Sequence, residues 1–173
     1  MAEKRGKIVF VIGGAKSGKS GFALRSASAC EGRRAYLATA QAFDREMEER
    51  IARHKAERSE EWAVHEEPVR IAALLKEIHP VYDVLLLDCL TLWISNLLLG
   101  ERDIEAETGA FLEAVSACSA TLFIVSNEVG WGIVPDNALS RKFRDIAGSL
   151  NQKIAAVADE VYLVTAGIPV KIK

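Results

Sequence analysis

The sequence has few cysteines, no long hydrophobic run and no excess of basic residues, and each of these absences excludes a class of protein. Its three cysteines, Cys30, Cys89 and Cys118, are widely spaced and form no Cys-x-x-Cys pair, so neither a disulfide framework nor a zinc site is expected. No apolar run is long enough to span a membrane, and residues 1–6 lack the apolar core of a signal peptide. We therefore expect a protein of the reducing cytoplasm without a membrane span.

A formal net charge of −2 argues against a nucleic-acid-binding protein, which usually carries a basic excess, although it leaves room for a local basic patch. Internal repeats, low-complexity tracts and linkers are also missing, so the 173 residues are expected to form a single domain, 1–173. Half of the residues are hydrophobic and 27% are charged, which is typical of a globular protein with a substantial core.

Stretches typical of strands and of helices alternate along the chain, which predicts an α/β fold with a mostly parallel sheet flanked by helices. The expected strands are residues 8–12, 34–38, 84–88 and 121–126, followed by a C-terminal antiparallel pair, 161–164 and 169–172. The expected helices are residues 19–29, 44–54, one that begins at Pro68 and continues to 78, one from Leu90 to 99, one through Phe111 and Val115 after an acidic loop at 101–107, and 138–158.

Residues 8–20 join an apolar strand, a glycine-containing loop and a helix start. Gly13, four further residues and then Gly18, Lys19 and Ser20 match the phosphate-binding loop, whose backbone N–H groups surround phosphate oxygens at the positive end of the following helix. In such a loop, Lys19 reaches the β and γ phosphates and Ser20 holds Mg²⁺. The alternative is an ordinary glycine turn, which the preceding strand and the helix-forming residues that follow disfavour.

The apolar run at 84–87 ends in Asp88, at the carboxyl end of a strand, which is the ligand side of a parallel sheet. A carboxylate at this place commonly holds or orients Mg²⁺ in phosphate-loop proteins, so Asp88 is predicted as a metal partner. The alternative is that Asp88 caps the helix that begins near Leu90, and the two roles are compatible.

Two further segments leave alternatives open. The helix over 92–99 is more apolar than one core-facing stripe requires, which fits burial either between subunits or inside the domain. The apolar loop at 127–135 follows a strand on the ligand side, and it either closes over a substrate or packs on the sheet.

The phosphate loop indicates a triphosphate but not the reaction. A switch GTPase would carry Asn-Lys-x-Asp where residues 126–129 read Ser-Asn-Glu-Val, so a small-molecule kinase is the first interpretation. His54 lies among Arg50, Arg53, Lys55 and Arg58, whose charges would lower the pKa of the imidazole and stabilise phosphoryl oxygens while the imidazole attacks phosphorus. From the residues alone, a solvated histidine on a charged helix face is the alternative.

Six segments, in order along almost the whole chain, resemble one enzyme family. They are 13–20 (GGAKSGKS), 36–41 (YLATAQ), 50–58 (RIARHKAER) with Trp62 and Glu66, 87–93 (LDCLTLW) with Asn96, 126–135 (SNEVGWGIVP), and 141–148 (RKFRDIAG) with Asn151. Their succession is similar to that of the bifunctional adenosylcobinamide kinase / adenosylcobinamide-phosphate guanylyltransferase family of cobalamin biosynthesis. Each motif alone is unspecific, but the succession is specific.

The resemblance implies a P-loop NTPase with a RecA-like sheet, assembled as a homotrimer that would cover the apolar helix at 92–99. It also implies two reactions. ATP or GTP phosphorylates the aminopropanol hydroxyl of adenosylcobinamide, and GTP then donates GMP to that phosphate, which releases pyrophosphate and gives adenosylcobinamide-GDP. The resemblance implies that the second reaction passes through a GMP-histidine intermediate, and the histidine of the family's Arg-Ile-x-x-His pattern matches His54. Some relatives carry two adjacent histidines here, whereas this chain has Arg53 and His54, which leaves His54 as the candidate in this segment.

The resemblance also assigns the nucleotide contacts and the catalytic groups. His54 and Lys19 are the expected catalytic residues, and Ser20 and Asp88 are the expected Mg²⁺ partners. Lys16 stands where the family usually has arginine, so the planar fork that can hold a phosphate bidentately is lost. The expected nucleotide contacts are Gly13, Gly14, Ala15, Lys16, Ser17, Gly18, Lys19, Ser20, Thr39, Ala40, Gln41, Lys55, Ala56, Glu57, Arg58, Glu66 and Asp88.

Two other functions remain open at the level of sequence. One is a phosphate-loop kinase without nucleotidyl transfer, and the other is a nucleotide-binding regulatory module with little turnover. The residues that contact the corrinoid, the base for its hydroxyl and the preferred phosphate donor are not identified by any motif.

Overall fold

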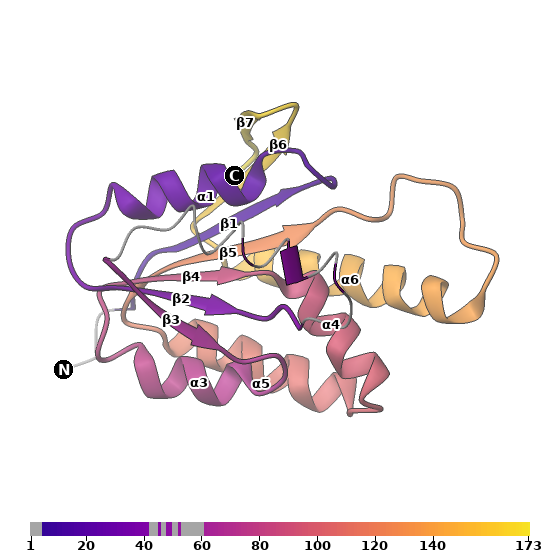
Figure 1. The fold of residues 1–173 in the computed structure, drawn as a ribbon, viewed down its shortest axis with the longest axis horizontal. Helices are drawn as coiled ribbons and strands as arrows, with labels where there is room; N and C mark the ends of the chain where they lie inside the picture. Colours follow the sequence, from indigo (N-terminus) through magenta and orange to yellow (C-terminus); the bar gives the residue numbers. More distant parts are fainter. Residues whose placement is uncertain (1–4, 42–44, 46–47, 50–51, 53–60) are drawn as a thin grey trace.

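The computed structural model describes residues 5–41, 45, 48–49, 52 and 61–173 (Figure 1). Through these residues runs one seven-stranded sheet, in the order β3-β2-β4-β5-β1-β6-β7. Neighbouring strands are parallel from β3 to β6, and β6 and β7 are antiparallel. The strands are β1 (Ile8–Gly13), β2 (Arg34–Ala38), β3 (Trp62–Glu66), β4 (Val84–Asp88), β5 (Thr121–Asn127), β6 (Glu160–Thr165) and β7 (Ile168–Lys171).

Helices cover both faces of the sheet, so the predicted α/β fold with a mostly parallel sheet and a C-terminal antiparallel pair is confirmed. Figure 1 shows α1 on one face and α3, α4, α5 and α6 on the opposite face. Alternation along β1 divides the core accordingly, because Ile8 and Phe10 pack in the cluster that α3, α4, α5 and α6 share, whereas Val9 packs with Ala23 of α1. The helices are α1 (Lys19–Ser28), α3 (Ile71–Ile78), α4 (Leu90–Leu99), α5 (Ile104–Ala117) and α6 (Ala138–Val157).

The apolar character of α4 is explained mainly by burial inside the chain. Trp93, Ile94 and Leu97 have no exposed surface, and burial of each such side chain contributes about 1.5–3 kcal/mol to stability. Leu99, at the end of the helix, is 63% exposed. No helix in the described part of the chain is long and apolar enough to cross a membrane.

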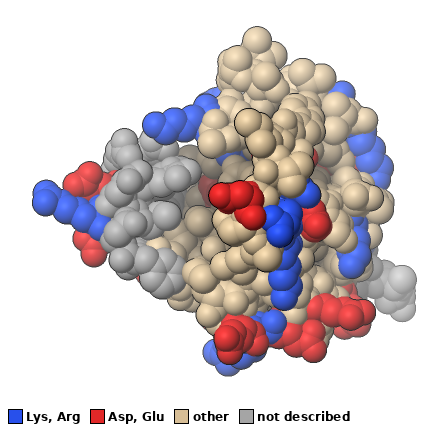
Figure 2. Space-filling view, turned by 90° about the vertical axis from the view of Figure 1, so that its right-hand side faces the viewer, with Lys and Arg blue, Asp and Glu red and all other residues tan. Residues whose placement is uncertain are grey.

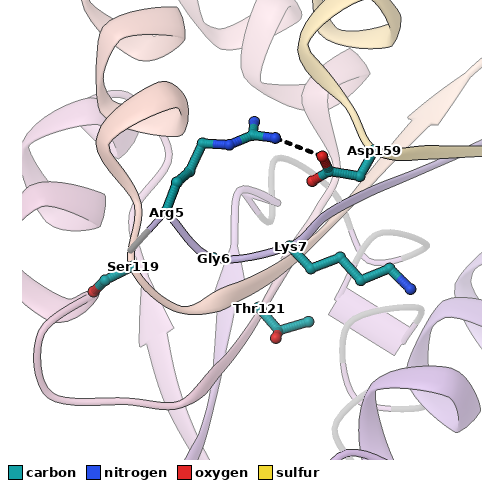
Figure 3. Close-up of a pocket in the computed structure, with 6 residues that line it drawn as sticks. All are labelled: Arg5, Gly6, Lys7, Ser119, Thr121 and Asp159. Atoms are coloured by element: carbon teal, nitrogen blue, oxygen red, sulfur yellow. Dashed lines mark hydrogen bonds and ion pairs between the residues drawn. The ribbon is translucent and has the colours of Figure 1, made fainter. Parts of the chain in front are cut away.

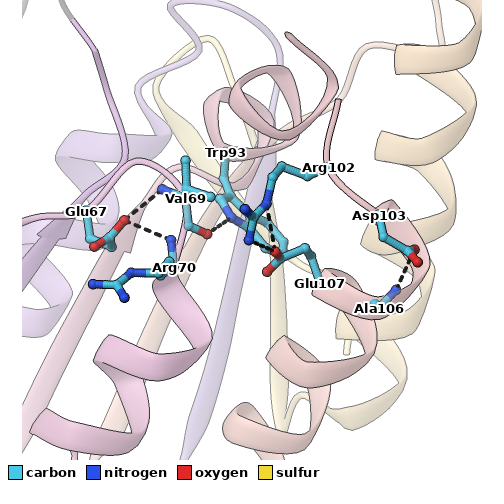
Figure 4. Close-up of polar contacts among 8 residues, drawn as sticks. All are labelled: Glu67, Val69, Arg70, Trp93, Arg102, Asp103, Ala106 and Glu107. Carbon is cyan, nitrogen blue, oxygen red and sulfur yellow. Dashed lines mark hydrogen bonds and ion pairs between the residues drawn. The ribbon is translucent and has the colours of Figure 1, made fainter. Parts of the chain in front are cut away.

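The prediction that a helix begins at Pro68 is wrong, because α3 begins at Ile71. The carboxylate of Glu67 accepts hydrogen bonds from the N–H groups of Val69 and Arg70 at 3.0 and 2.8 Å and so holds a turn before the helix (Figure 4). The indole Nε1 of Trp93 donates to the carbonyl of Val69 at 2.7 Å, which fastens this turn to α4.

The acidic segment at 101–107 is not wholly a loop, because α5 already begins at Ile104. Asp103 is its N-cap, and its side chain accepts a hydrogen bond from Ala106 N at 3.0 Å (Figure 4). Glu105 and Glu107 lie in the first turn, where negative charge is favourable at the positive end of a helix. The second part of the acidic run, from Ile104 onward, is therefore a helix start.

Strand β3 was not predicted from the sequence. It is a short strand at the edge of the sheet, and Trp62 is its buried residue, with its ring 6.3 Å from that of Tyr36 in an edge-to-face arrangement. The alternation of buried and exposed residues along β3 is hard to see in the sequence because charged residues stand next to it. Of the helix predicted over 44–54, residues 45, 48, 49 and 52 are described and helical, and the remainder lies outside the described residues.

At the amino end of β1 lies a pocket of about 470 Å³ (Figure 3). Arg5 and Asp159 form an ion pair beside it, and Asp159 also accepts a hydrogen bond from Ile8 N at 2.7 Å, which fastens the start of β1 to the chain before β6. The pocket lies at the opposite end of β1 from the phosphate loop, and in a parallel sheet ligands bind at the carboxyl ends. Its lining residues are Arg5, Gly6, Lys7, Ser119, Thr121 and Asp159.

Candidate active site

The phosphate loop, residues 13–20, connects β1 to α1 at the carboxyl edge of the sheet (Figure 1). Its first residue, Gly13, pairs with Asn127 of β5 on one side and with Val164 of β6 on the other. A Cβ atom on Gly13 would lie 2.5 Å from both the carbonyl oxygen of Val164 and Oγ of Ser17, so no larger residue fits. Gly18 has a φ of +94°, which a glycine adopts without strain.

Neighbouring segments hold the backbone of the phosphate loop in place. Gly167, in the turn between β6 and β7, donates its N–H to the carbonyl of Ser17 at 2.8 Å, and a Cβ on Gly18 would lie 3.1 Å from Cα of Gly167. On the other side, Glu128 N donates to the carbonyl of Gly13 at 3.0 Å. A loop that is fixed before the ligand arrives needs little reorganisation to bind it.

The start of α1 favours an anion. Its N-cap, Gly18, offers no side-chain cap, and the first turn contains no acidic residue, so nothing there compensates the positive end of the helix. Lys19, only 7% exposed, donates from Nζ to the carbonyl of Gly14 at 3.1 Å. The hydroxyl of Ser17 is buried without a hydrogen-bond partner in the described structure. These groups together suit phosphate oxygens.

Asp88 lies at the end of β4, and β5 separates β4 from β1 in the sheet. Its Oδ2 accepts a hydrogen bond from the Tyr36 hydroxyl at 2.9 Å. The N-cap of α4 is Cys89 and shows no side-chain capping bond, so capping does not account for Asp88. Burial raises the pKa of the Cys89 thiol, the charge of Asp88 raises it further, and the charge of Lys19 acts in the opposite direction. The charges of Asp88 and Lys19 therefore both reach the Cys89 thiol at this edge of the sheet.

Thr39 connects the segments that follow β2 and β4. It is fully buried, and its Oγ1 donates to the carbonyl of Cys89 at 2.7 Å and accepts from Cys89 N at 2.9 Å. Asn96 of α4 then donates from Nδ2 to the carbonyls of Thr39 and Pro68 at 2.8 and 2.9 Å. Thr39 is an expected nucleotide contact, and its hydroxyl positions the chain next to Asp88.

The structure brings only part of the predicted site together, because His54, Lys55, Ala56, Glu57 and Arg58 lie outside the described residues. In the sheet register, Ala38 pairs with Glu66 of β3 and with Asp88 of β4, so both carboxylates end their strands at the same level. Glu66 is exposed, and Ala40 and Gln41 are half-buried. Lys16 is exposed in the loop with a φ of +53°.

Sequence reasoning missed the residues that position this edge. Tyr36 donates to Asp88, Thr91 Oγ1 accepts from Asn127 N at 3.0 Å, and Asn151 Nδ2 donates to the carbonyl of Asn127 at 3.2 Å. Tyr36, Asn127 and Asn151 lie within or beside the motifs of the resemblance, but no spacing rule predicts that their side chains meet across the fold.

The loop after β5 is open to solvent. Val129 packs against the core, but Trp131, Ile133 and Val134 are 77%, 98% and 62% exposed. Packing on the sheet, one of the two interpretations of this loop, is therefore wrong for the part beyond Val129. Figure 2 looks from the side toward which the parallel strands point, and it shows acidic and basic side chains close together within a broad uncharged surface. The visible described surface therefore carries no field of a single sign.

The oxygen ligands at this edge of the sheet fit Mg²⁺ of the kind that is bound together with a nucleotide. Within the described residues, no three acidic, histidine or cysteine side chains gather as a metal cluster. Mg²⁺ in kinase and ATPase sites is instead held by one or two protein oxygens together with substrate phosphates and water. The hydroxyl of Ser20, in the first turn of α1, and the carboxylate of Asp88 are oxygens of this kind.

A phosphate loop between a central parallel strand and a helix, with a carboxylate at the end of a nearby strand, defines a P-loop nucleotide-binding enzyme. The family model described as cobinamide kinase / cobinamide phosphate guanyltransferase matches residues 9–172. The chain belongs to this family of bifunctional enzymes, which confirms the resemblance found in its motifs.

Two relatives show how evenly the similarity is spread. The bifunctional adenosylcobalamin biosynthesis protein CobP of Pseudomonas aeruginosa is 43% identical over 165 residues, which cover 94% of this chain and 95% of the relative. The bifunctional adenosylcobalamin biosynthesis protein CobU of Salmonella typhimurium is 41% identical over 184 residues, which cover 96% and 99%. The similarity is therefore not confined to the phosphate loop.

Proposed function

We propose that this enzyme phosphorylates adenosylcobinamide with a nucleoside triphosphate and then transfers GMP from GTP to the new phosphate through a GMP-histidine intermediate at His54. The observation that carries the proposal is the rigid phosphate loop, with Lys19 at the start of α1 and Asp88 at the same edge of the sheet, in a chain of the cobinamide kinase family. The proposed nucleotide contacts are those that the motifs assign.

In the first reaction, the hydroxyl oxygen of the aminopropanol arm attacks the γ-phosphorus. The bond from this phosphorus to the β–γ bridging oxygen breaks, the nucleoside diphosphate leaves, and the hydroxyl proton passes to solvent. Lys19 and the N-terminus of α1 stabilise the negative charge on the phosphate oxygens throughout. Ser20 and Asp88 would hold Mg²⁺, which neutralises charge on the β and γ phosphates when it is bound.

In the second reaction, an imidazole nitrogen of His54 attacks the α-phosphorus of GTP and pyrophosphate leaves. A phosphate oxygen of adenosylcobinamide phosphate then attacks the same phosphorus, which breaks the P–N bond, frees His54 and gives adenosylcobinamide-GDP. The support is the position of His54 within the motif at 50–58 and its basic neighbours. We further propose that residues 1–173 form one domain that works as a homotrimer in the cytoplasm.

The test is incubation with α-labelled GTP followed by denaturation. Label that is acid-labile and base-stable indicates a phosphoramidate on histidine. We expect His54→Ala to abolish this label and guanylyl transfer while some phosphoryl transfer remains. His79→Ala is the matched control, because His79 contacts Ser119 near the amino edge of the sheet, and it should keep the label. Unchanged labelling of the His54 variant would refute the assignment.

Lys19→Ala tests whether one loop serves both reactions. We expect both to slow by about 100-fold or more, because the lysine stabilises charge on the phosphates in each case. Full phosphoryl transfer in this variant would rule out a shared site. Phosphoryl transfer by the wild-type protein without any protein label would instead favour a kinase without nucleotidyl transfer, and nucleotide binding without corrinoid modification would favour a regulatory module.

A further inference from the structure

Asn127, the last residue of β5, has a side-chain acceptor to which neither the motif at 126–135 nor the proposed mechanism assigns a role. Phe123 and Val125 of the same strand pack in the core beneath α1, so alternation places Asn127 on that face too. Asp88 follows Leu86 of β4 in the same way. Asn127 and Asp88 therefore share the face of the sheet that carries α1 and its phosphate loop.

The backbone of Asn127 is fixed from both sides. Strand β4 ends at Asp88, opposite Val125, and beyond this point Asn127 N donates to Thr91 Oγ1 at 3.0 Å while Asn151 Nδ2 donates to Asn127 O at 3.2 Å. Side chains of α4 and α6 thus replace the missing strand. On the other side, Asn127 pairs with Gly13, the first residue of the phosphate loop. Its position relative to the loop is therefore set.

The amide oxygen of Asn127 is buried, and within the described residues it has no hydrogen-bond partner. A buried acceptor without a partner is destabilising, and where one persists in a native structure a functional use is a reason for it. Phosphate oxygens are negatively charged acceptors and do not suit this atom. A group that donates a proton in a hydrogen bond does.

The proposed kinase reaction brings such a donor to this edge. The attacking group is an alcohol, and before attack its O–H must be oriented so that a lone pair of the oxygen faces the γ-phosphorus. An amide oxygen is too weak a base to take the proton, but it can hold the O–H. After transfer, the alcohol oxygen is a phosphate ester without hydrogen, so the bond disappears in the product.

We propose that Asn127 Oδ1 accepts a hydrogen bond from the attacking hydroxyl of the acceptor substrate and thereby positions it for phosphoryl transfer. This inference rests on the proposed function and extends it to the acceptor side of the site. Thr91 and Asn151 are positioning residues, since they hold the backbone of Asn127. Attack of His54 on GTP involves no substrate hydroxyl, so Asn127 is not required for protein labelling.

The test compares Asn127→Leu, which keeps the size of the side chain without an acceptor, with Asn127→Asp, which keeps an oxygen at Oδ1. Phosphoryl transfer from a γ-labelled triphosphate to adenosylcobinamide is measured at saturating nucleotide, and labelling by α-labelled GTP is measured without corrinoid. We expect Asn127→Leu to lower kcat for phosphorylation by about 10- to 100-fold and to keep the labelling rate within about 3-fold. Asn127→Asp should retain more phosphorylation than Asn127→Leu.

Asn137→Ala is the matched control, because Asn137 Oδ1 is already used to cap α6, accepting from Ser140 N at 2.8 Å. Its kcat should equal that of the wild type. Normal phosphorylation by Asn127→Leu, equal loss of phosphorylation and labelling, or an aspartate variant no better than the leucine variant would each overturn the inference alone. A wild-type protein that transfers no phosphoryl group to the corrinoid would overturn the proposed function and this inference with it.

Discussion

Replacement of Thr39 by valine tests whether buried hydrogen bonds beside Asp88 hold the candidate site in place. Valine has nearly the same shape as threonine but no oxygen. The change therefore removes the acceptor for Cys89 N and the donor for the Cys89 carbonyl, at 2.9 and 2.7 Å. The carbonyl keeps a hydrogen bond from Trp93 N at 3.3 Å, so Cys89 N is the buried group that loses its partner. Because Cys89 follows Asp88 directly, the loss of these hydrogen bonds should lower both the stability and the activity of the protein.

The expected loss in the free energy of unfolding is about 2–4 kcal/mol. A hydrogen bond contributes about 1 kcal/mol net, and a buried group left without its partner adds a desolvation cost of about 1–3 kcal/mol. For a protein of this size, such a loss lowers Tm by about 4–16 °C. We also expect protein labelling by α-labelled GTP to slow, since residue 39 then holds the backbone at Asp88 and Cys89 only through the hydrogen bond from its own N to the Asp88 carbonyl, at 3.3 Å.

Urea unfolding at pH 7 measures this loss, with two variants for comparison. Thr39→Ser keeps the hydroxyl and removes one methyl group, so it should cost about 1 kcal/mol. Thr165→Val makes the same chemical change at an exposed position of β6 and should stay within about 0.5 kcal/mol of the wild type. A loss for Thr39→Val below about 1 kcal/mol, or equal to that of Thr39→Ser, would refute the reasoning.

Two further predictions concern the surface. Glu160 lies 2.8 Å from Lys7 and 3.1 Å from Lys171, and hydrogen bonding to Lys7 and then to Lys171 lowers the pKa of Glu160 to about 2. These ion pairs stabilise the folded protein by about 1 kcal/mol, as expected for partly exposed groups. This contribution is present above about pH 4.5 and is lost as the pH falls toward 2. In urea unfolding, the wild type should therefore be more stable than Glu160→Gln at pH 6 but not at pH 2. Trp131 is 77% exposed, whereas the other two tryptophans are buried. If the loop that carries Trp131 closes over bound corrinoid, the corrinoid should quench tryptophan fluorescence more in the wild type than in Trp131→Phe. Equal quenching in the two proteins would count against closure of this loop over the substrate.

The elements with strong local signals were predictable from the sequence. Strand β4 has the predicted bounds, and the strand, loop and helix around Gly13 and Lys19 differ from the prediction by at most one residue at each end. In these segments, the apolar run, the glycines and the helix-forming residues all favour the same structure. Local preference and tertiary packing agree there, which is why the phosphate loop could be recognised before its surroundings.

The hydrogen bonds that position the site could not be predicted. Thr39 and Cys89 are 50 residues apart, and Tyr36 and Asp88 are 52 apart. No local pattern distinguishes a threonine that will bond a distant backbone from one that will face a ligand. The turn at Glu67 could not be predicted either. The Glu67 carboxylate accepts hydrogen bonds from the N–H groups of Val69 and Arg70, which favours a turn over a helix that begins at Pro68.

The rigidity of the phosphate loop bears on how one loop could serve two reactions. Gly13 is enclosed so closely that a single added carbon would lie 2.5 Å from its neighbours, and Gly167 and Glu128 hold the loop at 2.8 and 3.0 Å. A loop fixed in this way presents the triphosphate similarly in both reactions. Within the proposed function, the choice between the γ- and the α-phosphorus then depends on which nucleophile is in place. In these proposals, the corrinoid hydroxyl approaches past Asn127, His54 belongs to the segment after β2, and Lys19 stabilises the phosphate charge in either case.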